Sequence, residues 1–334
     1  MGPQNGLKIG THPRCLSFKF SVMGCSFSAQ VHAFWTWADW LKQQAAQFGR
    51  EPVFINLDET AVSKAHPDAI GMVVSKQWWP GPVRPQQKVP KKDLRSMVTH
   101  VGLCTHRTDL QARLPQIFIG NPYCFTSELV DHIAQVAPGK VKFWRRTSSW
   151  NSSKLMCTIL LELALAVAGF PEVQPILVMG CAGIHLTTEV LRAASAFGIW
   201  ILPVPARCTF LLQPCDTHVF SPYKAFLRNA YRRLKDASGQ VSREAWAQSL
   251  VDVATRFLCG RRWSDAFYET GLLGKRERLT RDLASVVVPP VPSAALMPTV
   301  TAVREVLPSS RRRLPYSLLL SEPRGLQIRR LFVL

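Results

Sequence analysis

The sequence predicts an α/β fold in which a mixed sheet carries helices on both faces, and two observations indicate it. Apolar runs of strand length occur at 53–57, 96–104 and 114–119, and a polar, charged turn at 105–109 separates the last two. Two further apolar runs, at 175–179 and 199–203, alternate with segments of helical periodicity. A run of strands followed by alternating strands and helices is typical of a helix-covered mixed sheet.

Each element has its own local signal. A helix is expected at 31–48, because apolar residues recur there at helical spacing and Gly49 follows as a stop. The runs at 96–104 and 114–119 form an antiparallel hairpin around the polar turn. A short helix at 127–136, a short strand at 140–144 and a long apolar helix capped by Asn151 or Ser152 come next. Further helices are expected at 187–197, 222–234 and 242–259.

Composition divides the chain into four parts. Residues 1–30 show no periodicity and are expected to be a poorly ordered N-terminal segment. The α/β domain is assigned to 31–240, and a helical basic extension to 241–284. The remainder, 285–334, contains repeated prolines and the run Arg311–Arg313, so it is expected to be a Pro/Arg-rich flexible tail.

The charge balance indicates a polyanionic partner. Lys and Arg total 41 against 22 Asp and Glu, a formal net charge of +19, of which +11 lies from Ser221 onward. Nucleic acid is the expected partner, and an anionic membrane surface is the competing explanation. The most apolar segment, Leu155–Phe170, is shorter than the roughly 20 residues of a membrane span. Nine scattered cysteines without a close pair, and no clear signal peptide, favour an intracellular protein that is not secreted.

The first strand ends in two acids, Asp58 and Glu59. Adjacent residues of a strand point to opposite faces, so these two side chains cannot serve one site. Asp58 is therefore a candidate site residue, although a strand-end acid can also cap the segment that follows it.

Three motifs resemble the DDE-superfamily transposases of the pogo, Tigger and jerky group. Asn56–Thr60 (Asn-Leu-Asp-Glu-Thr) is similar to the strand that carries the first acid of that family. Leu177–His185 is similar to the strand of the second acid, with its trailing histidine, and Leu211–Asp216 to the loop of the third acid. The resemblance covers residues 34 to 235 and implies a ribonuclease-H-like mixed sheet with helices on both faces.

The resemblance also implies a metal-dependent site. Three converging carboxylates in this family hold two divalent ions, Mg²⁺ or Mn²⁺, about 4 Å apart, which activate a nucleophile and stabilise the leaving oxygen of a phosphodiester. Asp58 and Asp216 are the implied catalytic and metal-binding residues. Gly180 stands where the second acid is expected. The candidates for replacing the missing acid are Glu59, Cys181, His185 and Glu189. Glu59 faces away, Cys181 is a soft ligand ill suited to Mg²⁺, and the other two need a changed loop or helix entry.

The leading hypothesis is a transposase-derived domain that binds DNA without sequence preference and has lost most or all strand cleavage. Sequence-specific recognition is doubtful because some thirty residues precede the core, too few for the helix-turn-helix modules of active members of the family. The candidate nucleic-acid contacts are Arg145, Arg146, Lys224, Arg228, Arg232 and Arg233. The alternatives are an active Mg²⁺-dependent endonuclease or transposase with a rearranged second ligand, and a non-catalytic module for protein or RNA partners. Nuclear localisation is expected from the basic tail, and a homodimer remains open.

Overall fold

The computed structural model describes residues 27–63, 97–235 and 241–287. Most of the expected N-terminal segment, and all of the expected tail from residue 288 onward, therefore lie outside the described residues. The run Arg311–Arg313, on which the nuclear hypothesis rests, lies outside them as well.

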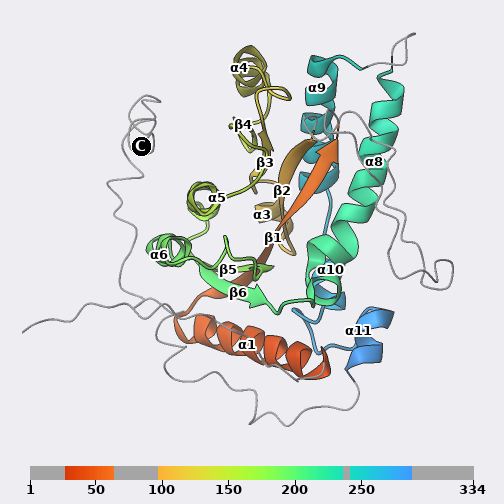
Figure 1. The fold of residues 1–334 in the computed structure, drawn as a ribbon. Helices are drawn as coiled ribbons and strands as arrows, with labels where there is room; N and C mark the ends of the chain where they lie inside the picture. The colour runs from red at the N-terminus through yellow and green to blue at the C-terminus, as the bar shows by residue number, and fades with distance from the viewer. Residues whose placement is uncertain (1–26, 64–96, 236–240, 288–334) are drawn as a thin grey trace, which may run out of the picture.

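The described residues contain a six-stranded sheet of order β4-β3-β2-β1-β5-β6 (Figure 1). The strands are β1 (Glu51–Ser63), β2 (Met97–Thr105), β3 (Gln116–Gly120), β4 (Val141–Arg145), β5 (Val173–Gly180) and β6 (Trp200–Val204). β2 is antiparallel to both β1 and β3, whereas β4 is parallel to β3, β5 to β1 and β6 to β5. All strands except β2 therefore run in one direction, and their carboxyl ends meet at the same edge of the sheet.

The expected mixed sheet is confirmed, and so is each expected strand. β1 is longer than predicted: it continues five residues beyond Asp58, to Ser63. The reason is that β2 supplies hydrogen-bonding partners along this extension, with Asp58 opposite Gly102 and Ser63 opposite Met97. Pairing on the other side, with β5, stops at Asn56 opposite Val178.

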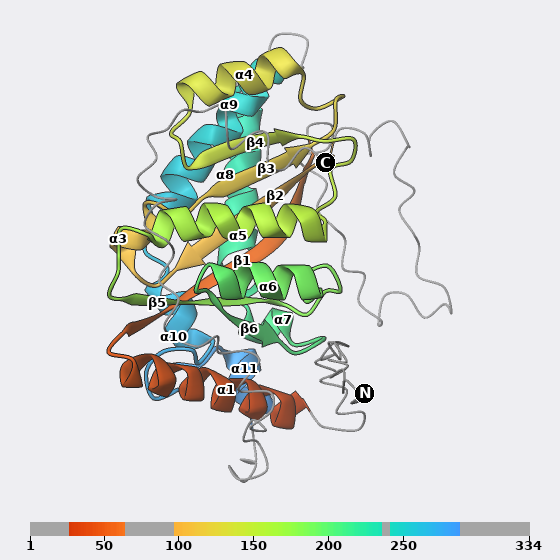
Figure 2. The same ribbon diagram turned by 90° about the vertical axis from the view of Figure 1, so that its left-hand side faces the viewer.

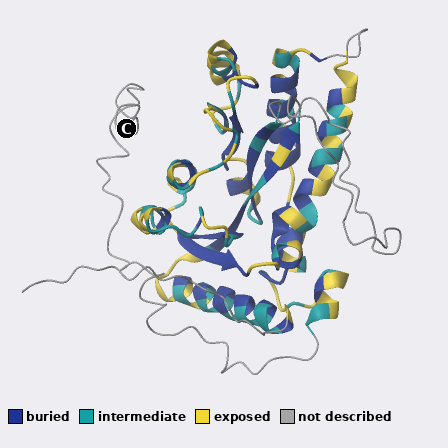
Figure 3. Cartoon of the chain, viewed as in Figure 1, coloured by how far each residue is buried: buried dark blue, intermediate teal, exposed yellow. Residues whose placement is uncertain are grey.

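Helices cover both faces of the sheet (Figures 2 and 3). α5 (Ser153–Val167) and α6 (Thr188–Ala196) pack with the side chains of one face, including Ile55, Leu57 and Leu177. The opposite face packs against α1 (Phe27–Gln47), α4 (Ser127–Val136), α8 (Phe220–Arg233) and α9 (Arg243–Val253). The shorter elements are α3 (Thr108–Gln111), α7 (Thr209–Leu212), α10 (Ser264–Glu269), α11 (Arg281–Val286) and two π-helical segments, η1 (Cys215–Val219) and η2 (Ala254–Cys259).

The helix ends follow the sequence signals. Ser152 is the N-cap of α5, because its side chain accepts a hydrogen bond from the Leu155 amide. Gly49 ends α1 with a positive φ of 67°, which lets the Arg50 amide donate to the Ala45 carbonyl at 2.9 Å. Within the described part of the chain, no helix has the length and apolar character needed to cross a membrane.

The helical extension that begins with α9 packs into the same core as the sheet. Trp35 Nε1 in α1 donates to the carbonyl of Thr270 at 3.0 Å. Gln111 Nε2 donates to the carbonyl of Leu258 at 2.9 Å, across 147 positions of sequence. Buried residues from α9 to α11 belong to the core cluster that also contains Phe54 of β1. The extension therefore helps to cover the face of the sheet to which Phe54 of β1 points.

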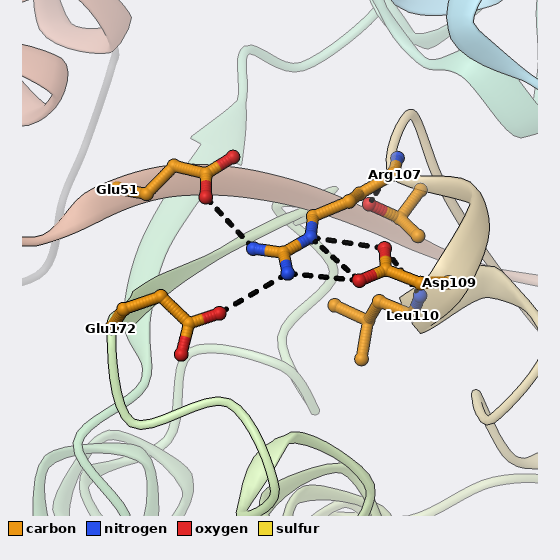
Figure 4. Close-up of polar contacts among 6 residues, drawn as sticks. Glu51, Arg107, Asp109, Leu110 and Glu172 are labelled. Carbon is orange, nitrogen blue, oxygen red and sulfur yellow. Dashed lines mark hydrogen bonds and ion pairs between the residues drawn. The ribbon is translucent and has the colours of Figure 1, made fainter.

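A cluster of ion pairs around Arg107 lies at the opposite edge of the sheet, where β1 and β5 begin (Figure 4). The guanidinium group of Arg107 contacts Glu51 at 2.8 Å, Asp109 at 2.8 Å and Glu172 at 3.1 Å. It also lies 5.0 Å from the centre of the Phe170 ring. A planar fork of donors suits several carboxylates at once. The cluster therefore joins the starts of β1, α3 and β5 at the edge away from Asp58.

Candidate metal and nucleic-acid site

Asp58 lies inside β1, at the point where only one neighbouring strand continues. β2 still pairs with it, but the β5 ladder ends two residues earlier, at Asn56. Asp58 is half-buried. Since Asp58 is a strand residue, the alternative in which it caps a following segment is wrong.

Asp58 and Glu59 lie on opposite faces of the sheet, as the period of two predicts. Glu59 accepts a hydrogen bond from Asn151 Nδ2 at 2.6 Å and contacts His185 Nε2 at 3.1 Å. Both partners belong to the α5 and α6 side of the sheet. The electrostatic neighbours of Asp58 include Asp216, which comes from η1 on the other side.

Asp216 belongs to a π-helical turn and not to the loop that the sequence predicted. α7 and η1 replace that loop, and η1 leads directly into α8. Asp216 is exposed, and its amide donates to the carbonyl of Gln213 at 3.0 Å. Such wide turns are frequent at functional sites, where they redirect a side chain.

Asn56 joins the three chain segments that surround Asp58. Its side chain is fully buried, and its Oδ1 accepts a hydrogen bond from the Cys215 amide at 2.7 Å. Its Nδ2 donates to the carbonyl of Val178 at 2.9 Å. One carboxamide therefore fixes β1, the end of β5 and the start of η1 relative to one another.

The structure brings the two predicted acids together. Burial, the charge of Asp216 and a side-chain hydrogen bond with Asp216 together raise the pKa of Asp58 to about 8. The pKa of Lys224 is lowered by burial, while the charges of Asp216 and Asp58 oppose that shift. Lys224 was predicted as a nucleic-acid contact, but here it lies within electrostatic reach of both acids. Two carboxylates and one ammonium group thus share the carboxyl edge of the sheet.

Gly180, the last residue of β5, points to the face that carries Asp58. The parallel register pairs Asn56 with Val178, and Asp58 and Gly180 each lie two residues beyond this last pair, on the same face. A Cβ atom at Gly180 would lie 3.7 Å from Gln213 Oε1 and 3.9 Å from Thr209 Cγ2, which are ordinary contacts. Gly180 does not have a positive φ angle, so its backbone conformation does not require glycine. A Cβ atom at this position would therefore fit, and the chain has no acid there.

Gln213 lines the space beside Gly180 and was missed by the sequence analysis. Its side chain is fully buried, and neither its Oε1 nor its Nε2 has a hydrogen-bond partner among the described residues. A buried polar group without a partner destabilises a fold by about 1–3 kcal/mol. No sequence signal distinguishes such a glutamine from one that is satisfied.

His185 forms a buried ion pair with Glu59 behind the end of β5. His185 Nδ1 lies 2.8 Å from the Gly180 carbonyl, and its Nε2 lies 3.1 Å from Glu59, so both nitrogens donate when the ring is protonated. The hydrogen bond to Glu59 raises the pKa of His185 against the effect of its burial. The bond from His185 likewise lowers the pKa of Glu59. This pair holds the tip of β5 against β1, on the face away from Asp58.

The predicted basic contacts separate into two groups. Arg145 and Arg146 are exposed at the end of β4, at the same carboxyl edge as Asp58. Trp150 follows them and has an exposed fraction of 82%; the sequence analysis did not single it out. Arg228 is half-buried in α8, whereas Arg232 and Arg233 are exposed at its far end, about 20 Å along the axis from Phe220. The structure does not bring this second group to the acids.

Replacing Asn56 tests the brace between β1, β5 and η1. Asn56→Ala removes the buried hydrogen bonds to the Cys215 amide and the Val178 carbonyl, so we expect the free energy of unfolding in urea to fall by about 2–4 kcal/mol. Hydrogen exchange at the Cys215 amide should accelerate as well. The control is Asn121→Ala, which removes Oδ1 contacts of 3.0 and 3.1 Å in a partly exposed turn. Equal losses for the two variants would contradict the role of Asn56.

Removing the imidazolium of His185 should have a pH-dependent effect. Because the pKa of His185 is raised, its stabilisation of the fold is complete below pH 6.5 and is lost as the pH rises through the pKa of the folded state. Because the pKa of Glu59 is lowered, its stabilisation is complete above pH 4.5 and is lost as the pH falls. His185→Gln should therefore lower the free energy of unfolding most between these values, by about 3 kcal/mol.

The matched control is His218→Gln, which removes a more exposed contact of 3.0 Å with Glu269. We expect it to change the free energy of unfolding by less than about 1 kcal/mol. Chemical unfolding from pH 4 to pH 9 measures both variants. A pH-independent difference between His185→Gln and the unmodified chain would show that the ion pair does not form.

Comparison with known proteins gives likeness at the level of fold. No protein-family model matches the sequence, and no curated protein matches it. The chain is similar to the Mos1 strand transfer complex, with 12% identity, a TM-score of 0.43 and 77% of this chain covered. It is also similar to a pre-cleavage Mos1 transpososome, with 13% identity, a TM-score of 0.42 and 77% of this chain covered. For the Mos1 mariner paired-end complex with Mn, the identity is 13%, the TM-score 0.43 and the coverage of this chain 78%.

This chain spans only 62–63% of the length of those Mos1 chains. The assignment of its fold rests on its own sheet. A meander of β1, β2 and β3, with β5 and β6 added in parallel beside β1 and helices on both faces, is a ribonuclease-H-like fold.

Proposed function

We propose that the chain is a transposase-derived, DDE-type domain that binds nucleic acid and has lost most or all of its capacity for strand cleavage. One observation carries the proposal. Asp58 of β1 and Asp216 of η1 are electrostatic neighbours at the carboxyl edge of the sheet, and the strand end between their segments presents Gly180 instead of an acid.

The donors around Asp58 suit a divalent metal ion only in part. Asp58 and Asp216 would hold Mg²⁺ or Mn²⁺, because both ions favour carboxylate oxygens. When bound, such ions polarise a phosphodiester and lower the pKa of a coordinated water. The described residues contain no group of three or more His, Cys, Asp and Glu side chains that could hold a metal ion. A third carboxylate, which the family resemblance calls for, is absent from this edge.

The four candidates for replacing the missing acid are poorly suited to the role. Glu59 is bonded to Asn151 and His185 on the other face of the sheet. The ring of His185 is engaged with Glu59 and with the Gly180 carbonyl. The Cys181 thiol is a soft ligand that suits Mg²⁺ badly, and Glu189 is exposed in the first turn of α6. An active enzyme with a rearranged second ligand is therefore the less supported alternative.

Exposed side chains on and after β4, at the carboxyl edge of the sheet and three strands across from β1, favour contact with a nucleic-acid backbone. Arg145 and Arg146 offer two exposed guanidinium groups at this edge, and the exposed indole of Trp150 offers a stacking surface for a base. Neither kind of contact depends on base identity. Together with the net charge of +19, this supports DNA binding without sequence preference. Nuclear localisation belongs to the same proposal and follows from the basic composition alone.

Restoring the missing acid tests the catalytic part of the proposal. We expect the unmodified chain to nick supercoiled plasmid weakly or not at all in Mg²⁺ or Mn²⁺, and Gly180→Asp to raise the nicking rate by about 100-fold, as a regained ligand would. Gly183→Asp is the matched control, because a Cβ atom there meets nothing within 4 Å. Adding Asp58→Asn to the Gly180→Asp variant should abolish the gain.

Robust nicking by the unmodified chain that Asp58→Asn abolishes would contradict the proposed loss of cleavage. It would favour the alternative with a rearranged ligand.

Salt dependence tests the binding part. Affinity for a duplex of arbitrary sequence should fall steeply between 50 and 200 mM salt, on the order of 10³-fold or more for six or more phosphate contacts. Removing Arg145 and Arg146 together should reduce the slope of log K against log salt by about 1–2. The control is Arg113→Ala, an exposed arginine at the opposite edge, whose guanidinium lies 5.0 Å from the Phe170 ring. Affinity that does not change with salt would favour an interaction module for protein partners.

A further inference from the structure

The Gln213 carboxamide is the strongest unexplained feature of the site. It is fully buried, and both of its polar atoms lack partners among the described residues. Buried polar groups in native proteins nearly always have a partner, so an orphaned pair of this kind indicates a ligand or a water molecule. Its Oε1 lies 3.7 Å from the position that a Cβ atom of residue 180 would occupy. The unpaired oxygen therefore borders the place from which an acid is missing.

The main chain of Gln213 is held rigidly in that position. Its amide donates to the Thr209 carbonyl at 2.9 Å, and its carbonyl accepts from the amides of Asp216 and Thr217, each at 3.0 Å. The turn that presents Asp216 is thus the same turn that presents Gln213. Cys215, between them, is fixed by its hydrogen bond of 2.7 Å to Asn56. Two oxygen-bearing side chains of one braced turn reach the edge where β1 presents Asp58.

The chemistry of these donors matches a divalent cation. Asp58 and Asp216 supply negative charge, and a glutamine carbonyl oxygen is a hard, neutral ligand of the kind that Mg²⁺ and Mn²⁺ accept. An aspartate at position 180 would instead bring a carboxylate beside the carboxamide, whose Nε2 could then donate a hydrogen bond to it. The absence of that acid leaves the oxygen of Gln213 available.

We propose that the Gln213 Oε1 atom takes the ligand place that Gly180 leaves vacant and completes, with Asp58 and Asp216, a three-oxygen site for one divalent cation of the Mg²⁺ and Mn²⁺ class. This inference rests on the proposed function for the roles of the two acids. It goes beyond it by giving a binding role to a residue that is neither an acid nor part of the DDE triad. With one such cation site, the protein binds metal even though it lacks the two-ion arrangement needed for strand cleavage.

Mn²⁺ binding to the full chain without DNA tests the proposal, with the loss of the free-Mn²⁺ electron paramagnetic resonance signal as the readout. Gln213→Leu keeps a side chain of similar size and removes the oxygen, and we expect it to weaken Mn²⁺ binding by about tenfold or more. Gln213→Glu adds a charged oxygen and should strengthen binding by a similar factor. Without metal, Gln213→Leu should unfold at the same temperature as the unmodified chain or higher, because the orphaned group is gone.

The Gly180→Asp background separates a ligand from a merely structural residue. With an acid at 180 supplying the third oxygen, Gln213→Leu should weaken Mn²⁺ binding by much less than it does in the unmodified chain. A structural role for Gln213 would give equal losses in both backgrounds, and that result would overturn the proposal.

Three further outcomes decide between this proposal and the proposed function. If Gln213→Leu leaves Mn²⁺ binding unchanged, the proposed role of Gln213 is overturned and a buried water is its partner. The proposed function then still stands. Binding by Gly180→Asp but not by the unmodified chain would do the same. Absence of binding in both chains would overturn the metal site itself and, with it, the DDE-type interpretation of Asp58 and Asp216.

Discussion

The carboxamide of Asn56 is the interaction on which the geometry of the site depends. Its two strongest hydrogen bonds, 2.7 Å to the Cys215 amide and 2.9 Å to the Val178 carbonyl, are both fully buried. Each joins β1 to a segment more than 120 positions away in sequence. Asp58 lies two residues beyond Asn56, and Gly180 lies two residues beyond Val178. Asp216 directly follows Cys215. A shift of η1 or of the tip of β5 relative to β1 would therefore have to break a buried hydrogen bond.

Most of the fold could be predicted from the sequence, because its strands and helices have strong local signals. The apolar runs predicted the strands, and the period of two placed Asp58 and Glu59 on opposite faces. The extension of β1 beyond Asp58 could not be predicted, because it depends on β2 as a partner and not on its own composition. The turn at η1 was predicted as a loop for a related reason: an amide hydrogen bond to Asn56, 159 positions away, holds it in place.

The candidate site was predicted less completely than the fold. Motif resemblance identified Asp58, Asp216 and the glycine between them, but a motif shows neither burial nor partners. The orphaned carboxamide of Gln213 and the 82% exposed fraction of Trp150 are properties of packing, and identical residues elsewhere in the chain would have the same sequence signals. Lys224 illustrates the same limit. Its charge suggested a contact with phosphate, but the sequence did not show that it lies within electrostatic reach of both acids.

The surroundings of Gly180 would accommodate a Cβ atom. Its nearest neighbours, Gln213 Oε1 and Thr209 Cγ2, would lie at ordinary contact distances of 3.7 and 3.9 Å. The imidazolium of His185 still braces the strand tip from behind. The end of β5 therefore accepts a side-chain carbon at position 180 without a shift of the atoms around it. A single substitution there would change the chemistry of this edge and leave the frame that positions Asp58 in place.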